Sequence, residues 1–238
     1  MHIKKSKMPM SWPVPRKGRG KSFVAVPSHS KSKGISLLFL LRDVLKLVKT
    51  RKEARYMTLN GMVKVNNLIR RDENFPCQVF DTLTLSVQSV GDRQPVTGSR
   101  YYRLEIVNRK FALKEISEKE VGSKIVKISG KKILGKNEVQ MNLDDGQNFI
   151  SNEKFSVGDS AVLNTAGGSG EEGVGKVTVE KVLALKVGAK VEIVVGKHAG
   201  EKGELVGIEK LVRGCDYLIK FGDGREVSLP FKTILVIG

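Results

Sequence analysis

Apolar residues recur with the spacing of an α-helix directly after Gly34. Residues three and four positions apart share one face of a helix, and the apolar set that follows this rule is Leu37, Leu38, Leu41, Leu45 and Val48. Arg42, Lys46 and Lys49 repeat at the same steps on another face. The spacing therefore predicts an amphipathic helix over about residues 37–48 with a basic outer face.

A second helix is predicted from its end signals. Thr50 and Glu53 match a capping box, in which the hydroxyl caps the Glu53 amide while the carboxylate reaches back. The helix should run over residues 51–59 and end at Asn60-Gly61, a favourable pair for a helix C-terminus. Residues 62–67 then alternate as a strand that leads into a turn, and a second strand follows over residues 80–87.

From residue 101 onward the helical period disappears and short alternating runs take its place. In the middle of the chain these runs are residues 102–107, 123–129, 139–143 and 161–163, with turn formers at 136–137 and 144–146. They predict a compact β-barrel or sandwich. Near the end, runs at 191–195, 205–208, 217–221, 227–229 and 235–237 predict a smaller barrel. The expected fold class is α+β with several domains.

Composition supports several small domains and a polyanionic partner. The chain has 238 residues, of which 14 are aromatic, so several small aliphatic cores are favoured over one large core. It carries 42 Lys plus Arg against 25 Asp plus Glu, a net charge of +17. Such a charge favours a partner that is nucleic acid or an acidic membrane surface. Residues 1–56 alone hold fifteen basic and two acidic side chains.

The first 33 residues hold nine Lys or Arg and no acid, with Pro, Gly and Ser scattered among them. We interpret this stretch as a basic arm with little structure of its own, which orders on a polyanion. Its apolar residues could stack on bases or enter a groove: Met8, Met10, Trp12, Phe23 and Val24. The alternative is a solvated tail in which Trp12 only covers a patch of the folded protein.

Signals for other classes of protein are weak. Cys77 and Cys215 are isolated, which argues against a zinc site and against a secreted disulfide framework. No apolar run approaches the roughly 20 residues of a membrane helix, and no signal peptide is evident. We therefore expect a soluble, intracellular protein that does not enter a membrane.

Two glycine motifs and the dispersed histidines also provide little evidence for a nucleotide site or a catalytic site. Residues 168–173 fit a dinucleotide-binding string, but a β-pattern follows where a helix is needed. Residues 170–176 nearly form a phosphate-binding loop, but Val177 replaces the hydroxyl that binds magnesium. The three histidines are dispersed. We expect no catalytic residue, no metal, no cofactor and no small-molecule substrate.

The helix–helix–strand order of residues 37–66 resembles the S-four RNA-binding domain. In that family, the two helices and the turn after them present basic side chains to folded RNA. The matching residues are Arg42, Lys46, Lys49, Arg51, Lys52, Arg55 and Lys64. The alternative is an amphipathic helical hairpin whose charges only face water.

Residues 187–208 resemble the KOW motif of ribosomal proteins and NusG-like transcription factors. Gly196, Gly200 and Gly203 would allow a tight loop whose backbone N–H groups approach phosphates. Candidate contacts on this loop are Lys197, His198 and Lys202. KOW modules bind either RNA or protein, and the barrel they form is of the Src-homology-three-like kind. The alternative is a barrel whose glycines only serve its turns.

The order of these parts resembles the S-four-e family of small-subunit ribosomal proteins over essentially the whole chain. The resemblance implies a basic extension over 1–36, an S-four-like domain over 37–95, a β-rich central domain over 96–180 and a KOW domain over 181–238. It also implies a structural role in the cytoplasmic ribosome, as a monomer that binds small-subunit rRNA beside neighbouring ribosomal proteins. A KOW-containing transcription elongation factor and an RNA-modifying enzyme are the alternatives.

The predicted RNA contacts combine the arm, the helices and the KOW loop. They are Lys4, Lys5, Lys7, Trp12, Arg16, Lys17, Arg19, Lys21, Lys31, Lys33, Arg42, Lys46, Lys49, Arg51, Lys52, Arg55, Lys64, Lys197, His198 and Lys202.

Overall fold

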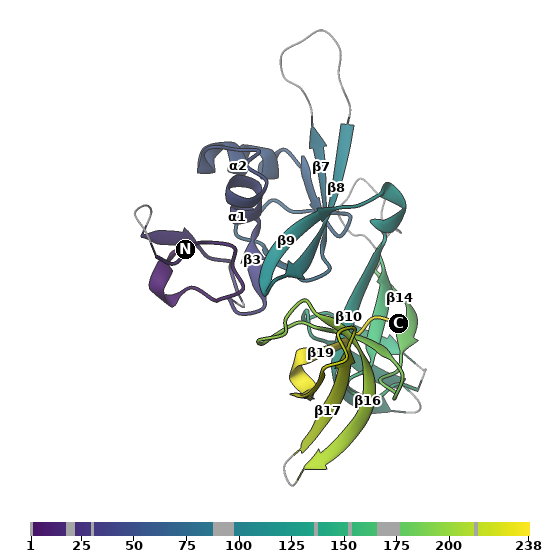
Figure 1. Cartoon of the computed structure of the whole chain (residues 1–238). Helices are drawn as coiled ribbons and strands as arrows, with labels where there is room; N and C mark the ends of the chain where they lie inside the picture. The colour runs from purple at the N-terminus through teal and green to yellow at the C-terminus, as the bar shows by residue number, and fades with distance from the viewer. Residues whose placement is uncertain are drawn as a thin grey trace. The chain divides into compact units, whose positions relative to one another are not determined.

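The computed structural model is built mostly of β-strands, with few and short helices (Figure 1). It describes residues 2–17, 22–29, 31–87, 98–135, 138–151, 154–165, 177–211 and 214–238. The chain divides into two compact units. Unit 1 comprises Met1–Ile106, Lys110–Gly122 and Thr165–Lys176, and unit 2 comprises Val107–Arg109, Ser123–Asn164 and Val177–Gly238. The two glycine motifs at 168–176 and the turn at 136–137 lie outside the described residues.

The N-terminal segment folds against the rest of unit 1. Strand β1 (His2–Lys4) pairs antiparallel with β2 (Phe23–Ala25), and a short 3-10 turn, η1 (Lys5–Lys7), follows β1. Met8 and Trp12 are only 2% and 1% exposed. The predicted arm with little structure of its own is therefore wrong for the described residues. Of its apolar residues, Met8, Trp12 and Val24 pack into the protein, whereas Met10 is 76% and Phe23 50% exposed.

The first helix is shorter than its apolar spacing predicts. Strand β3 (Gly34–Ser36) pairs with β6 (Pro76–Gln78), and α1 (Leu37–Phe39) continues as one π-helical turn, η2 (Leu40–Val44). The amide of Leu45 donates to the Leu40 carbonyl at 2.9 Å, five residues back. Lys46 then adopts a left-handed conformation with φ of 55°, which ends the helix. The predicted continuation to residue 48 is wrong.

The second helix, α2 (Arg51–Leu59), begins and ends where its signals predict. The Glu53 amide donates to the Thr50 hydroxyl at 3.3 Å, as a capping box requires. The Glu53 carboxylate accepts from the Lys49 amide at 2.8 Å and from the Thr50 hydroxyl at 2.9 Å. At the other end, Gly61 has a φ of +70°, the conformation that favours glycine after a helix. Ala54 and Thr58 form the buried face of α2.

A five-stranded antiparallel sheet completes unit 1. Its strands, in order across the sheet, are β5 (Leu68–Ile69), β4 (Val63–Val65), β7 (Thr82–Val87), β8 (Gly98–Val107) and β9 (Lys110–Glu115). Another 3-10 turn, η3 (Glu118–Glu120), follows β9. Because β7 pairs with β8, this sheet crosses the domain boundary predicted between residues 95 and 96.

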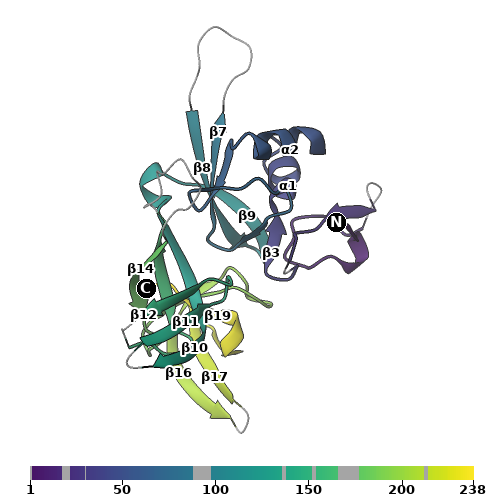
Figure 2. The ribbon, with the colours of Figure 1, turned by 180° about the vertical axis from the view of Figure 1, so that it is seen from behind.

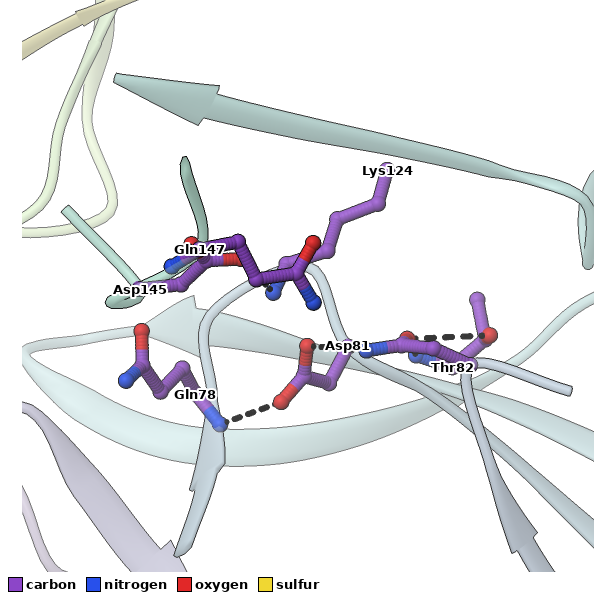
Figure 3. A network of polar contacts seen from close by, with 7 residues as sticks. Gln78, Asp81, Thr82, Lys124, Asp145 and Gln147 are labelled. Atoms are coloured by element: carbon purple, nitrogen blue, oxygen red, sulfur yellow. Dashed lines mark hydrogen bonds and ion pairs between the residues drawn. The ribbon is translucent and has the colours of Figure 1, made fainter. Parts of the chain in front are cut away.

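A polar network fixes the turn between β4 and β5. Asn66 and Asn67 have φ of 51° and 65°, as in the two-residue hairpin turns that favour asparagine. The Asn66 amide group donates to the Asp81 carboxylate at 2.8 Å, and its oxygen accepts from the Thr82 amide at 2.9 Å. Figure 3 shows the Gln78 amide donating to the same carboxylate, at 2.7 Å. These bonds hold the loop before β7 against the turn.

The first sheet of unit 2 surrounds one of its two cores. Its strands, in order, are β12 (Asn148–Ser151), β11 (Glu138–Leu143), β10 (Ser123–Gly135), β13 (Ser160–Asn164) and β14 (Thr178–Leu183), and Figure 2 shows β10, β11 and β12 side by side. The core residues are Val126, Ile128, Met141, Leu143, Phe155, Ala161 and Leu163. These strands confirm the alternating runs predicted at 123–129, 139–143 and 161–163, whereas the run at 102–107 lies in β8 of the unit 1 sheet.

The C-terminal sheet of unit 2 surrounds the second core. Its strands, in order, are β18 (Glu226–Pro230), β17 (Gly214–Phe221), β16 (Lys202–Leu211), β15 (Lys190–Ile193) and β19 (Ile234–Val236), with a 3-10 turn, η4 (Phe231–Thr233), before β19. Its core residues are Val191, Ile193, Leu205, Ile219, Phe221, Ile234 and Val236. The register shifts between Leu205 and Gly207, and beyond this shift Ile208 is 43% exposed. Val195 lies beyond β15 and is 59% exposed.

A partly buried lysine ties the C-terminal segment of unit 2 to β10. The Lys127 ammonium donates to the carbonyls of Phe231 and Ile234 and lies 3.8 Å from the centre of the Phe231 ring. Burial lowers the pKa of Lys127 to about 8, and nearby Asp144 opposes this shift. A second lysine on β10, the buried Lys124, pairs with Asp145 at 2.9 Å.

Candidate nucleic-acid interface

The positive charge of the chain is concentrated in unit 1. The sequence of unit 1 holds 25 Lys or Arg against 12 Asp or Glu, a net of +13, whereas unit 2 holds 17 against 13, a net of +4. An excess of this size attracts phosphates and other anionic surfaces and repels basic ones. Unit 1 is therefore the part of the chain whose charge best suits a polyanion.

Most of the predicted contact residues are exposed. The exposed ones are Lys4, Lys7, Arg16, Lys17, Lys31, Lys33, Lys46, Lys49, Arg51, Lys52, Arg55, Lys197 and Lys202. Lys5, Arg42, Lys64 and His198 are partly buried. Arg19 and Lys21 lie outside the described residues. Exposure is necessary for a phosphate contact, and local partners then decide how much charge each side chain can offer.

Trp12 is placed where it cannot stack on a base. Its ring is 1% exposed and lies 6.2 Å from the Phe39 ring, centre to centre. The neighbouring backbone is held as well, because the Ser11 carbonyl accepts from the Phe111 amide at 2.8 Å and the Arg16 guanidinium donates to the Met8 carbonyl. The prediction of Trp12 as an RNA contact is therefore corrected: its indole belongs to the core that anchors the N-terminal segment.

The basic face predicted for the first helix is not formed. Arg42 lies on η2, and its guanidinium binds the Asp43 carboxylate at 2.6 Å. Lys46 follows the end of that helix, and Lys49 lies just before α2. The three residues therefore do not share a helical face, because the left-handed Lys46 interrupts the period on which that face depended.

Helix α2 offers two exposed cations that face no carboxylate. Within the described residues, Lys52 and Arg55 form no ion pair. Glu53, the one acid of α2, is held at the N-terminus of the helix by its bonds to Lys49 and Thr50. The Lys49 amide, followed by the Thr50 hydroxyl, lowers the pKa of Glu53. Glu53 therefore stays charged within the capping box.

Arg51 has a structural partner that its sequence position did not reveal. Its guanidinium donates through both Nε, at 2.8 Å, and Nη2 to one oxygen of Glu73. The hydrogen bond and the charge of Glu73 raise the pKa of Arg51. The Glu73 side chain is 8% exposed, whereas that of Arg51 is 63% exposed. The buried carboxylate of Glu73 thus neutralises much of the charge that Arg51 could offer to a phosphate.

Two of the three contacts predicted for the loop after β15 have carboxylate neighbours, and one of these two, His198, is also partly buried. Nδ1 of His198 lies 3.2 Å from the Glu201 carboxylate, and the His198 ring stacks on Phe221 with 5.5 Å between centres. Lys202 begins β16 and lies 3.7 Å from the buried Glu192 carboxylate. Lys197 is exposed. Gly196 and Gly200 have φ of 111° and 91°, so the tight loop does require glycine at these two positions.

Other kinds of site are not evident in the part of the chain that the structure describes. In the described ranges, no three His, Cys, Asp or Glu side chains gather closely enough to hold a metal ion. Cys77 is buried and Cys215 is exposed, and neither forms a disulfide. No helix among these residues is both long and apolar enough to cross a membrane.

These features describe a basic, β-rich protein, and comparison with known proteins places it among ribosomal proteins. The chain matches ribosomal family S4e over residues 97–169. It is 30% identical to the small ribosomal subunit protein eS4 of Methanopyrus kandleri, over 87% of this chain and 80% of that protein. It is also 30% identical to eS4 of Halorubrum lacusprofundi, over 99% of this chain and 92% of that protein.

A solved structure has the same fold. The crystal structure of the 30S ribosomal protein S4e from Thermoplasma acidophilum matches with a TM-score of 0.66 and 24% identity, over 87% of this chain and 96% of that one. This likeness shows the fold, and the sequence relatives show the family. The chain belongs to ribosomal family S4e, a family of structural proteins without enzymatic activity.

Proposed function

We propose that the chain is a structural constituent of the small ribosomal subunit in the cytoplasm and that it binds and stabilises folded small-subunit rRNA. Membership of family S4e carries this proposal. The net charge of +13 on unit 1 supports it independently, because rRNA is the abundant polyanion of the ribosome. In this role the protein works as a monomer beside neighbouring small-subunit proteins, and it needs no cofactor or small-molecule substrate.

The proposed mechanism is electrostatic first. Each cation that neutralises an RNA phosphate releases counterions, and the logarithm of affinity then falls with the logarithm of salt concentration by about 0.7 to 0.9 per contact. Exposed cations without carboxylate partners contribute most. On α2 these are Lys52 and Arg55, whereas Arg42 and Arg51 offer less because of Asp43 and Glu73. Folded RNA is then recognised by its shape and by unpaired bases.

The finer division of labour is part of the same proposal. Residues 37–95 act as the S-four-like RNA-binding domain, to which the hairpin partner β8 adds a strand. Residues 96–180 form the β-rich centre, and residues 181–238 act as a KOW barrel that reaches RNA or a neighbouring protein through Lys197. The tight loop at Gly196 and Gly200 supports the KOW interpretation. A transcription elongation factor or an RNA-modifying enzyme is not favoured by the relatives of this chain.

A salt titration of the full chain with small-subunit rRNA tests the mechanism. Replacing both Lys52 and Arg55 with Gln should weaken binding and reduce the salt slope by about 1.5, since two phosphate contacts are lost. Lys181 and Lys186 are exposed lysines of unit 2 and provide a matched control pair when both are changed to Gln. An unchanged slope in the α2 variant, or an equal loss in the control, would remove α2 from the interface.

A further inference from the structure

The outward face of α2 combines cations with exposed apolar side chains. Ala54 and Thr58 are fully buried, and α2 contacts α1 and η2. On the opposite side, residues spaced by three, four and seven positions form one stripe of exposed side chains: Lys52, Arg55, Tyr56 and Leu59. Tyr56 is 60% exposed and Leu59 is 53% exposed. We call this stripe the α2 stripe.

Tyr56 differs from the other aromatic residues of the described chain. Only Tyr56 and Phe23, among the aromatic side chains that the structure describes, are at least half exposed. Phe23 meets the ring of His2 edge-on, with 4.9 Å between centres. Tyr56 forms neither a ring contact nor a hydroxyl hydrogen bond within the described residues. Its ring therefore presents an aromatic face that nothing in the described fold uses.

The apolar surface continues a short distance past the helix. A Cβ atom at Gly61 would lie 3.5 Å from a methyl group of Ile69, so the Ile69 side chain lies against the backbone that follows α2. Ile69 is 41% exposed. It pairs across the β4–β5 hairpin with Lys64, another cation predicted to contact RNA. The α2 stripe thus begins with Lys52 and Arg55, and its other end lies near Lys64.

We propose that Tyr56 is a stacking platform for an unpaired nucleobase of the bound RNA, with Lys52 and Arg55 contacting neighbouring phosphates of the same strand. This inference rests on the proposed function. An aromatic ring rimmed by cations is the arrangement that binds single-stranded nucleic acid, because every base offers a π-face and every nucleotide a phosphate. The base must come from a loop, bulge or strand end, since bases within an A-form duplex keep their faces stacked.

Charge decides between RNA and a protein as the occupant. The stripe contains two cations and no acid, and the single carboxylate of α2 is engaged in its capping box. Two exposed apolar side chains also form a smaller surface than the groove that an amphipathic partner helix needs. A flexible basic tail, as a protein partner, would be repelled by Lys52 and Arg55. An RNA strand satisfies both the ring and the charges.

The main test compares Tyr56→Ala with Tyr56→Phe in the full chain. Stacking on an aromatic side chain corresponds to about a 5- to 150-fold change in affinity when alanine replaces it. We expect Tyr56→Ala to weaken binding to small-subunit rRNA within this range and to leave the salt slope unchanged, because no phosphate contact is lost. Tyr56→Phe keeps the ring and should bind as the unmodified chain does. Ile150→Ala removes an exposed apolar side chain of unit 2 that has no assigned role in binding, and this control should bind normally.

The outcomes separate this inference from the proposed function. If the unmodified chain fails to bind the rRNA, the proposed function fails and the stacking platform fails with it. If the chain binds and Tyr56→Ala binds equally well, only the stacking platform is overturned, and the α2 stripe faces a protein or solvent. Stacking is also overturned if Tyr56→Phe loses as much affinity as Tyr56→Ala does. It is likewise overturned if Tyr56→Ala binds with a reduced salt slope.

Fluorescence gives a second readout that does not depend on affinity. The chain contains a single tryptophan, Trp12, which is buried. In the Tyr56→Trp variant, the added indole is exposed and reports separately on α2. Binding of small-subunit rRNA should quench its emission, because a stacked base is an efficient quencher at contact distance. Saturating RNA without quenching, at unchanged affinity, would show that no base stacks at this position.

Discussion

The close packing of Gly203 on β16 gives the sharpest prediction about stability. A Cβ atom at this position would lie 2.6 Å from Cγ2 of Ile219 and 2.7 Å from the carbonyl oxygen of Lys220, both on β17. Ordinary contacts of a Cβ atom begin at 3.4 Å, so Ile219 or its strand must move by about 0.8 Å. Ile219 is fully buried in the C-terminal core, and a Lys220 carbonyl cannot move without its strand.

Gly203→Ala should therefore destabilise unit 2. Forcing one extra carbon into a packed core typically costs about 1 to 3 kcal/mol, and the rigid backbone neighbour favours the middle of this range, about 2 kcal/mol. For a chain of this length, such a loss lowers the midpoint of thermal unfolding by about 4 to 8 °C. Gly207 lies on the same strand and has nothing within 4 Å of the corresponding Cβ position, so Gly207→Ala is the matched control.

The assay combines differential scanning calorimetry with amide hydrogen exchange. Calorimetry gives the shift in midpoint for each variant, and exchange shows whether faster opening is confined to β15–β19. We expect the Gly207→Ala control to stay within about 0.5 kcal/mol of the unmodified chain. Equal midpoints for the two alanine variants would refute the packing argument and return Gly203 to the loop role that its sequence position indicated.

Two further predictions concern buried charges. Because the pKa of Lys127 is lowered to about 8 in the folded protein, the unfolded chain binds more protons than the folded chain between pH 8 and the ordinary lysine pKa. The free energy of unfolding should therefore rise with pH across that window. In urea titrations at pH 8 and 10, the Lys127→Met variant should lack this rise. The same pH dependence in the variant and the unmodified chain would contradict the prediction. Arg51→Gln should lower the unfolding midpoint more than Lys52→Gln does, because Glu73 stays buried without its cation, and adding Glu73→Gln should restore stability. A double variant no more stable than Arg51→Gln would show that this pair does not act through charge.

Local signals in the sequence predicted local structure well. Thr50, Glu53 and Gly61 determine α2 because capping and glycine C-termini depend on neighbours within a few residues. The alternating apolar runs likewise predicted most strands of unit 2. The exposure of Tyr56 had a signal as well, since its spacing from Lys52 and Leu59 places the three side chains on one face.

The errors came from interactions that are distant in sequence or invisible to periodicity. Trp12 was interpreted as an RNA contact because the residues that surround it, Phe39 and the strand that contains Phe111, are distant from it in the sequence. The left-handed Lys46 ends a helix whose apolar period continues beyond it. Glu73, which holds Arg51, lies 22 residues away from it and carries no motif. Charge counting alone therefore overestimated how many cations stay available.

The central claim is that this chain is a structural part of the small ribosomal subunit. The most direct test is a sucrose gradient of native cell lysate, run at low and at high salt and followed by blotting for the chain. We expect stoichiometric co-migration with the small subunit at low salt and partial release at high salt, because exposed cations carry much of the binding. Migration as free protein, or together with RNA polymerase, at low salt would contradict the claim.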